Sequence, residues 1–358
     1  MHTPSAADFI VVCGFLGSGK TTLISSYLES TQATDTAVIV NDVGEINVDG
    51  AVLAMAGDLT LARLANGCVC CSLGNELLDT IEGLIEDRRR AGGTPFRRFI
   101  LECSGISDPA PIVRSLATLG AGRFRVKIVC TYSCLEIDRQ IESFAEAVSQ
   151  LAVAHVVVIT KMDLVDAETL ERARRTAAGL APLGRVSAAA NSGERFRSAF
   201  SLEDADILSH STNELPTALR SGELRHRSSG LFTEPHPRIS VYQLTYDTPM
   251  DWMLLQEWLE NLIGYFGDRV LRIKGIVRVT QSADPILIQS VGVHVDQPRE
   301  VRSDDDGSAL FVVLRDATSS ELTEVGPRLP LSHLRRLSGL TAFEGRGLLK
   351  DRAVACDA

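Results

Sequence analysis

The stretch that decides the fold is FIVVCGFLGSGKTTL, residues 9–23. It begins with a short apolar run, β-branched in its middle, that ends at a glycine, which is typical of a buried parallel strand. Residues 14–21, GFLGSGKT, then fit the pattern G-x-x-x-x-G-K-[ST]. The glycines let backbone N–H groups turn toward phosphate oxygens, and the following helix adds partial positive charge at its start. The stretch therefore predicts an α/β domain that binds a nucleotide.

Individual roles follow from this pattern. We expect Lys20 to reach the β- and γ-phosphates and the hydroxyl of Thr21 to ligate Mg²⁺. The other loop residues expected to contact the nucleotide are Gly14, Gly17, Ser18, Gly19 and Thr22. A dinucleotide-binding loop is excluded, because G-x-G-x-x-G is absent and a lysine occupies the turn.

Similar apolar runs alternate with helical patterns over residues 1–190. We predict strands at 37–40, 99–103, 126–129 and 156–160, and helices at 22–29, 76–91, 110–119 and 167–178. Strand alternating with helix predicts a mostly parallel sheet covered on both faces. The predicted fold class is α/β, a P-loop NTPase domain.

The remaining chain predicts a second, small α+β domain at 238–345. Residues 191–237, rich in Ser, Arg, Glu, Gly and Pro, are expected to be a linker with some local helix. Strands are predicted at 239–246, 270–279, 286–295 and 310–314, and short helices at 252–263 and 319–325. The first of these helices is amphipathic, with one apolar face formed by Trp252, Leu255, Leu259 and Leu262. Residues 346–358 are expected to be a frayed tail.

A second motif, Thr160-Lys161-Met162-Asp163, closes the strand HVVVIT. A carboxylate at Asp163 can accept hydrogen bonds from the N1–H and 2-amino group of guanine, a donor pair that adenine lacks. The stem of Lys161 would pack on the base. Because the motif follows the phosphate loop on a late strand, we expect it to read guanine. Residues 187–189, Ser-Ala-Ala, are a candidate for the loop that completes the base pocket.

Carboxylates follow two further strands. Asp42 and Glu45 come directly after the second strand, with Asp49 just beyond, and Glu102 ends the next strong strand. Carboxylates at the carboxyl ends of parallel strands suit Mg²⁺ contacts and water positioning. Gly105 suits a segment that shifts when the γ-phosphate leaves. The residues predicted to take part in hydrolysis are Lys20, Glu45 and Glu102, and Asp42, Glu45 and Asp49 are candidate metal contacts.

Cys68, Cys70 and Cys71 form a glycine-led cluster, GCVCC, at residues 67–71. Three thiolates suit Zn²⁺ or another borderline metal, and a fourth ligand would come from elsewhere. Redox thiols and inert cysteines are the alternatives from spacing alone. Cys13, Cys103 and Cys130 lie in apolar runs and are expected to be core residues.

Composition limits the partners. The chain has 358 residues and a formal net charge of -10, which disfavours nucleic acid as the main partner. No apolar run approaches the ~20 residues of a membrane span. The N-terminus has no secretory signal, so we expect a cytoplasmic protein with its eight cysteines mostly reduced.

Five motifs stand in a fixed order: GFLGSGKTTL, NDVGE at 41–45 with Asp49 downstream, GCVCC, ECSGISDP at 102–109, and TKMD. Together they closely resemble the CobW-like group of P-loop GTPases. The resemblance is strong over the first domain and weaker over the second, where it rests on the strand–helix pattern and on LRIKGI at 271–276.

The resemblance implies a GTP-hydrolysing metallochaperone that delivers zinc, cobalt or iron to a client metalloprotein. By position it assigns residues 14–22 to the phosphate loop, Glu102 to Gly105 to a switch with a Mg²⁺-linked glutamate, the three cysteines to metal, and Thr160 to Asp163 to guanine. Thiolate chemistry favours Zn²⁺ as the cargo, with Co²⁺ or Fe²⁺ as alternatives. The oligomeric state and the client are left open.

The sequence also departs from the family. NDVGE stands where Asn-Glu-Phe-Gly-Glu is common, and CTYSC at 130–134 stands where an acidic residue is usual. Two other functions stay open: a GTP-dependent assembly or regulatory switch with structural or redox cysteines, and a small-molecule kinase or ATPase.

Overall fold

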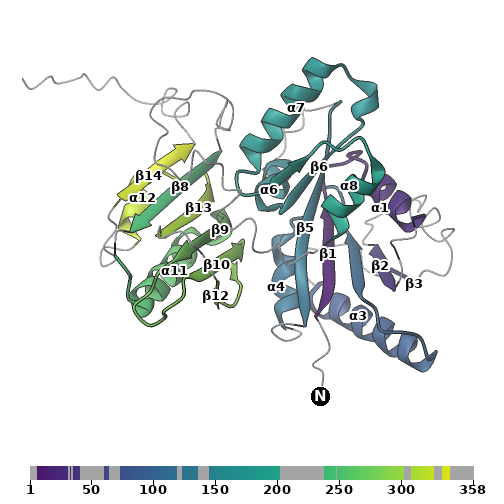
Figure 1. Ribbon diagram of the computed structural model, residues 1–358, viewed down its shortest axis with the longest axis horizontal. Coiled ribbons are helices and arrows are strands. Elements are labelled where there is room, and N and C mark those ends of the chain that lie inside the picture. The colour runs from purple at the N-terminus through teal and green to yellow at the C-terminus, as the bar shows by residue number, and fades with distance from the viewer. Residues whose placement is uncertain are drawn as a thin grey trace, which may run out of the picture.

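The computed structural model describes residues 6–30, 33, 35–40, 60–63, 73–118, 123–135, 145–201, 238–246, 248–301, 308–325 and 333–338. These residues form two sheets with their helices (Figure 1). No helix within these ranges is long and apolar enough to cross a membrane.

The first sheet is parallel throughout its described pairings. Its order is β3-β2-β4-β1-β5-β6-β7. The strands are β1 Ala7–Cys13, β2 Thr36–Val40, β3 Thr60–Arg63, β4 Arg98–Glu102, β5 Phe124–Ser133, β6 Val156–Thr160 and β7 Arg185–Ser187. The central strand β1 is almost wholly buried, as its unbroken apolar run requires. The predicted α/β P-loop fold is confirmed.

Helices cover both faces of this sheet (Figure 1). They are α1 Lys20–Leu28, α3 Leu73–Arg90, α4 Ala110–Thr118, α6 Ala145–Val153, α7 Ala167–Leu180 and α8 Ser192–Phe200. Side chains of α1 and α8 share one core with β1 and β6. Side chains of α3, α4, α6 and α7 share the core on the opposite face.

Helix α8 lies inside the range expected to be a linker with some local helix. Phe196, Ala199 and Phe200 are buried against the first sheet, and Phe200 stacks on Tyr27 of α1 with ring centroids 4.1 Å apart. The packed part of the first domain therefore runs to Phe200, past the predicted boundary at Ala190. The alternation of polar and apolar residues in SGERFRSAF is too short to have shown this.

The second sheet is antiparallel, with the order β11-β10-β9-β13-β8-β14 and β12 paired to β10. Its strands are β8 Ile239–Tyr246, β9 Val270–Val277, β10 Ile286–Val291, β11 His294–Val295, β12 Arg299–Glu300, β13 Ser308–Arg315 and β14 His333–Ser338. The helices are α11 Trp252–Phe266 and α12 Ser319–Glu324, besides a short 3-10 turn, η2, at Gly267–Arg269. The predicted α+β domain is confirmed.

Two details differ from the sequence prediction. The single strand expected at 286–295 is a hairpin, because Gly292 adopts a left-handed φ of 55° and reverses the chain between Val291 and His294. The apolar face of α11 is buried at Leu255, Leu259 and Leu262 as expected. Trp252 is only partly buried, and Trp258 fills the core instead.

The antiparallel sheet is buried on both faces. Along β13, Leu310, Val312 and Leu314 pack with α11, whereas Phe311 and Val313 belong to the core of the first domain. This is the period-two alternation of a strand. The two sheets therefore share one continuous core.

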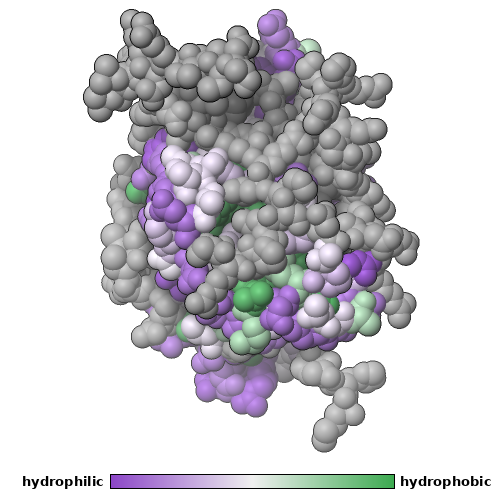
Figure 2. Space-filling model, turned by 90° about the vertical axis from the view of Figure 1, so that its left-hand side faces the viewer, coloured by the Kyte–Doolittle hydropathy of each residue, from purple (hydrophilic) through white to green (hydrophobic). Residues whose placement is uncertain are grey.

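Seen from the side of the second domain, the described surface is mostly hydrophilic or intermediate with a small hydrophobic area (Figure 2).

We predict that Phe311→Ala destabilises both domains together. Phe311 is 1% exposed in the shared core, and removing a buried phenyl ring typically lowers the free energy of unfolding by about 3–5 kcal/mol. Urea unfolding followed by tryptophan emission and by circular dichroism should show one transition at lower urea. Met253→Ala, at a side chain that is 66% exposed on α11, is the matched control and should change little. Two separate transitions in Phe311→Ala would contradict the shared core.

Candidate functional site

The loop between β1 and α1 has the backbone shape that phosphate binding needs. Gly14, Gly17 and Gly19 all have positive φ, of 140°, 70° and 90°. A Cβ at Gly14 would lie 2.3 Å from the hydroxyl oxygen of Thr131, so that position has room for glycine alone. Gly19 precedes the first residue of α1, so the free N–H groups of the helix face the loop.

Ser18 is held from two neighbouring strands. Its hydroxyl is hydrogen bonded to that of Thr131 in β5 at 2.7 Å. Its carbonyl accepts from the hydroxyl of Thr160 in β6 at 2.7 Å. Thr131 also donates to the carbonyl of Cys13 at 3.3 Å. The arch of the loop is thus fixed by side chains from the strands beside it.

The predicted phosphate and magnesium residues meet at this loop. Lys20 is buried, and its ammonium donates to the carbonyls of Gly14 at 2.9 Å and Phe15 at 3.3 Å. The hydroxyl of Thr21 donates to Oε1 of Glu102 at 2.5 Å. Glu102 ends β4, directly beside β1, and is 5% exposed. The structure therefore brings Lys20, Thr21 and Glu102 together, whereas Thr22 lies exposed on α1.

The segment after Glu102 packs closely on the phosphate loop. A Cβ at Gly105 would lie 2.8 Å from the backbone nitrogen of Leu16. The hydroxyls of Ser104 and Ser107 are hydrogen bonded at 2.7 Å. The buried amide of Gln150, in α6, donates to the carbonyls of Gly105 at 3.2 Å and Ser107 at 2.8 Å. Any displacement of this segment must therefore alter contacts with the loop and with α6.

The Thr160–Asp163 motif lies at the same edge of the sheet. Lys161 has a φ of 57°, a left-handed conformation that is unusual for lysine and clusters at functional sites. It precedes a single 3-10 turn, η1, at Met162–Leu164, and Asp163 on that turn is exposed. Since Thr160 also binds Ser18, the motif is joined directly to the phosphate loop.

Six predicted residues lie outside the described ranges: Asp42, Glu45, Asp49, Cys68, Cys70 and Cys71. The strands that lead into their segments end beside Glu102. Val40 of β2 is in register with Arg63 of β3 and with Glu102 of β4. Within the described part of the chain, no three His, Cys, Asp or Glu residues are grouped so that they could hold a metal ion.

The described cysteines are core residues, as predicted for Cys13, Cys103 and Cys130. All three are buried, and so is Cys134. A hydrogen bond to Cys130 and burial raise the pKa of Cys13 well above its ordinary value, and burial does the same for the pKa of Cys103. The thiols of Cys13 and Cys103 therefore stay protonated at neutral pH, and a protonated thiol is a poor metal ligand.

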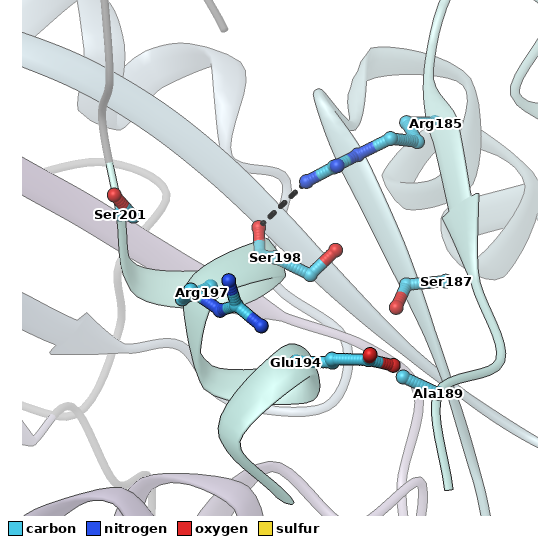
Figure 3. A pocket seen from close by; sticks show the side chains of 7 residues that line it. All are labelled: Arg185, Ser187, Ala189, Glu194, Arg197, Ser198 and Ser201. Carbon is cyan, nitrogen blue, oxygen red and sulfur yellow. Dashed lines mark hydrogen bonds between the residues drawn. The ribbon is translucent and has the colours of Figure 1, made fainter. Parts of the chain in front are cut away.

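A pocket of about 380 Å³ lies between β7 and α8 (Figure 3). It is lined by Arg185, Ser187, Ala189, Glu194, Arg197, Ser198 and Ser201. Arg185 spans it to donate to the carbonyl of Ser198 at 3.5 Å. The pocket shares Ser187 and Ala189 with the expected base loop, but it contains no residue of the phosphate loop or of the Thr160–Asp163 motif. It is therefore beside the nucleotide site and separate from it.

This geometry is that of a P-loop GTPase. The phosphate loop carries Lys20 and Thr21, and the carboxylate of Glu102 lies at the end of the adjacent strand. The Thr-Lys-x-Asp loop is bonded to Ser18.

Residues 8–187 match the family described as CobW/HypB/UreG, nucleotide-binding domain, and residues 239–325 match the cobalamin synthesis protein cobW C-terminal domain. The chain belongs to the CobW/HypB/UreG family, which confirms the resemblance found in its motifs.

Two curated relatives are similar over most of their length. The zinc chaperone YjiA of Escherichia coli (strain K12) is 29% identical over 290 residues, 78% of this chain and 85% of YjiA. The zinc chaperone CobW of a Sinorhizobium species is 26% identical over 323 residues, 80% and 86% of the two chains. The crystal structure of the Zn(II)-bound YjiA GTPase from E. coli has a TM-score of 0.63 at 21% identity, covering 90% of this chain and 98% of that one, which supports the fold.

The structure adds residues that sequence reasoning missed. Thr131 lies in CTYSC, a segment that stood out in the sequence without an interpretation. Gln150 lies in α6, which was not predicted as a helix. The only trace of them in the sequence is a polar residue within an apolar strand or helix. Such a residue cannot be assigned a role until the residues packed around it are known.

We predict that Thr131→Val weakens nucleotide binding. The valine keeps the volume but loses the hydroxyl that holds Ser18, and a net hydrogen bond contributes about 0.5–1.5 kcal/mol, or roughly two- to tenfold in affinity. Thr131→Ser keeps the hydroxyl and should bind nearly as the wild type does. Titration with a fluorescent guanine nucleotide measures both, and equal affinities for the Val and Ser variants would contradict the role of the hydroxyl.

Proposed function

We propose that this chain is a GTP-hydrolysing metallochaperone that binds zinc at Cys68, Cys70 and Cys71 and delivers it to a client metalloprotein. The observation that carries the proposal is the register of β2, β3 and β4, in which Val40, Arg63 and Glu102 are neighbours. The strands that precede the candidate carboxylates and the cysteines in the chain, β2 and β3, end there, beside the contact between Thr21 and Glu102. Two relatives are named zinc chaperones, which supports the cargo.

The nucleotide roles follow from the loop. Its backbone N–H groups and the start of α1 would surround the phosphates, and Lys20 would exchange the carbonyls of Gly14 and Phe15 for the β- and γ-phosphates. Asp163 would read guanine, with Lys161 against the base.

The residues present fit Mg²⁺, which prefers oxygen ligands. The hydroxyl of Thr21 donates a hydrogen bond to Glu102, so the lone pairs of the hydroxyl oxygen remain for a cation. Glu102 would hold Thr21 in that orientation. When bound beside the phosphates, Mg²⁺ supplies positive charge that offsets the charge of the triphosphate.

Coupling between the two ligands would arise at the edge of the sheet. Asp42, Glu45 and Asp49 are the candidates to sense the γ-phosphate or to complete the metal site. The motif itself supplies three thiolates, so a fourth ligand would come from elsewhere, and an incomplete site favours transfer over permanent structure. If GTP tightens zinc binding, zinc must tighten GTP binding by the same factor. Release after hydrolysis would then hand the ion to the client.

We predict that Asp163→Asn lowers the affinity for GTP and raises that for XTP. The amide cannot accept both guanine donors, whereas its NH₂ can donate to the 2-carbonyl of xanthine. Hydrogen bonds to charged groups contribute about 1.5–3 kcal/mol, so GTP binding should weaken roughly tenfold or more. Asp166→Asn is the matched control, because Asp166 caps α7 by accepting from Thr169. A variant at Asp163 that still prefers GTP over XTP and ATP would contradict guanine reading and favour the ATPase or kinase alternative.

We predict that zinc binds more tightly with a non-hydrolysable GTP analogue than with GDP, by a factor in the usual range of about 5–150 for coupled sites. The double variant Cys70→Ser, Cys71→Ser should lose this tight binding. Cys134→Ser, at a buried cysteine distant in sequence, should keep it. Competition with a chromophoric zinc chelator measures the zinc affinity of the wild type and of both variants.

Equal zinc affinities in the two nucleotide states would remove the coupling from the proposal. Unchanged zinc binding in the double variant would favour the alternative, a GTP-dependent assembly or regulatory switch with structural or redox cysteines.

A further inference from the structure

Helix α6 contacts the nucleotide site and the second domain through adjacent residues. On one side, Gln150, with none of its surface exposed, donates to the carbonyls of Gly105 and Ser107. On the other side, the hydroxyl of Ser149 accepts from Arg315 of β13 at 2.9 Å. Two consecutive residues of α6 thus bond to the segment after Glu102 and to the antiparallel sheet.

The end of α6 is also fixed to the second domain. Arg272 of β9 donates to the carbonyl of Ala154, directly after the last helical residue. Arg272 is 3% exposed, and burial lowers its pKa to about 10. A buried guanidinium is costly unless it is bonded, so this contact holds β9 against the helix end.

Apolar packing completes this attachment. Val148, Leu151 and Ala152 of α6 lie in one core with Leu271, Phe311 and Val313 of the antiparallel sheet. In Figure 1, α6 lies on the side of the first sheet that faces the second domain. A helix packed this closely moves as a unit, because protein interiors do not deform continuously.

A second contact starts from the other end of the same segment. Asp108 accepts from the backbone N–H of Ala110 at 3.0 Å, which fixes the start of α4. A Cβ at Gly292, in the turn between β10 and β11, would lie 2.9 Å from the Cβ of Ala110. The segment from Glu102 to Asp108 therefore touches the second domain through α6 and through the start of α4.

The amide of Gln150 is only half satisfied. Its Oε1 is buried and has no hydrogen-bond partner within the described residues. A buried acceptor without a partner is unusual in a folded protein. A different position of the Gly105–Ser107 backbone could offer it an N–H donor, so the bonding of this residue can respond to where the segment lies.

We propose that Gln150 is a positioning residue for the Glu102–Ser107 segment, and that α6 transmits the nucleotide-dependent position of this segment to the antiparallel sheet. The inference needs the nucleotide site and GTP hydrolysis, and it does not need the zinc cargo. The second domain would present one surface with GTP and another with GDP, so that a protein bound there could distinguish the two states.

The test compares the protein loaded with GDP and with a non-hydrolysable GTP analogue, both without zinc. Hydrogen exchange of peptides covering β9 and β13 should differ between the two states. Trp252 and Trp258 are the two tryptophans of the chain, and both lie on α11, so emission excited at 295 nm reports on the second domain alone.

Gln150→Met, which keeps length and packing but cannot donate, should abolish the exchange difference. It should lower kcat about tenfold or more while KM changes little, since misplacement of a catalytic segment acts on the chemical step. Ser149→Ala is the matched variant: it should weaken the exchange difference and leave kcat unchanged. A purely stabilising role for Gln150 would instead lower the unfolding midpoint and leave the difference in place.

Three outcomes would overturn the inference: no nucleotide-dependent exchange difference in β9 and β13 of the wild type, an undiminished difference in Gln150→Met, or an unchanged kcat in that variant. Nucleotide binding is measured first with a fluorescent guanine nucleotide. Loss of binding would overturn the nucleotide site as well, whereas intact binding without a difference would overturn the link alone.

Discussion

Ser18 is the residue on which the arrangement of the nucleotide site depends. Its carbonyl is bonded to Thr160 and its hydroxyl to Thr131, so two strands of the parallel sheet fix one turn of the loop. The bond from Thr160 also fixes the distance between the phosphate loop and the Thr160–Asp163 loop, which we propose reads guanine. Because a nucleotide must reach both loops at once, this spacing determines which ligands fit. Side chains of a rigid sheet hold such a geometry better than the loops could alone.

The antiparallel sheet shows a second dependence. A small α+β domain often leaves one face of its sheet to solvent. Here both faces are apolar, and α11 covers only one of them. The other face packs on α6, which also holds the segment after Glu102 through Gln150. Packing of the domains and placement of that segment therefore both depend on α6.

The sequence was sufficient for the features that depend on local pattern. Three such features were predictable: the phosphate loop, the parallel strands with their unbroken apolar runs, and most of the apolar face of α11. Each depends on residues that are close together in the sequence. The hairpin at Gly292 was missed because the flanking residues are β-branched on both sides and the glycine reads equally well as part of a strand. The packing of α8 on the first sheet and the contacts of Thr131 and Gln150 were missed for another reason. Their roles rest on contacts between residues far apart in the chain, such as the bond of Gln150 to Ser107.

The shared core has a consequence for how the protein is made. Synthesis proceeds from the N-terminus, so the apolar side of α6 emerges from the ribosome well before β8, β9 and β13 exist to cover it. At ordinary translation speed this interval lasts seconds to tens of seconds. During it the side of α6 that packs on β9 has no partner strand in the nascent chain. A chain cut short before β8 would therefore leave apolar surface uncovered that the full chain buries between its two sheets.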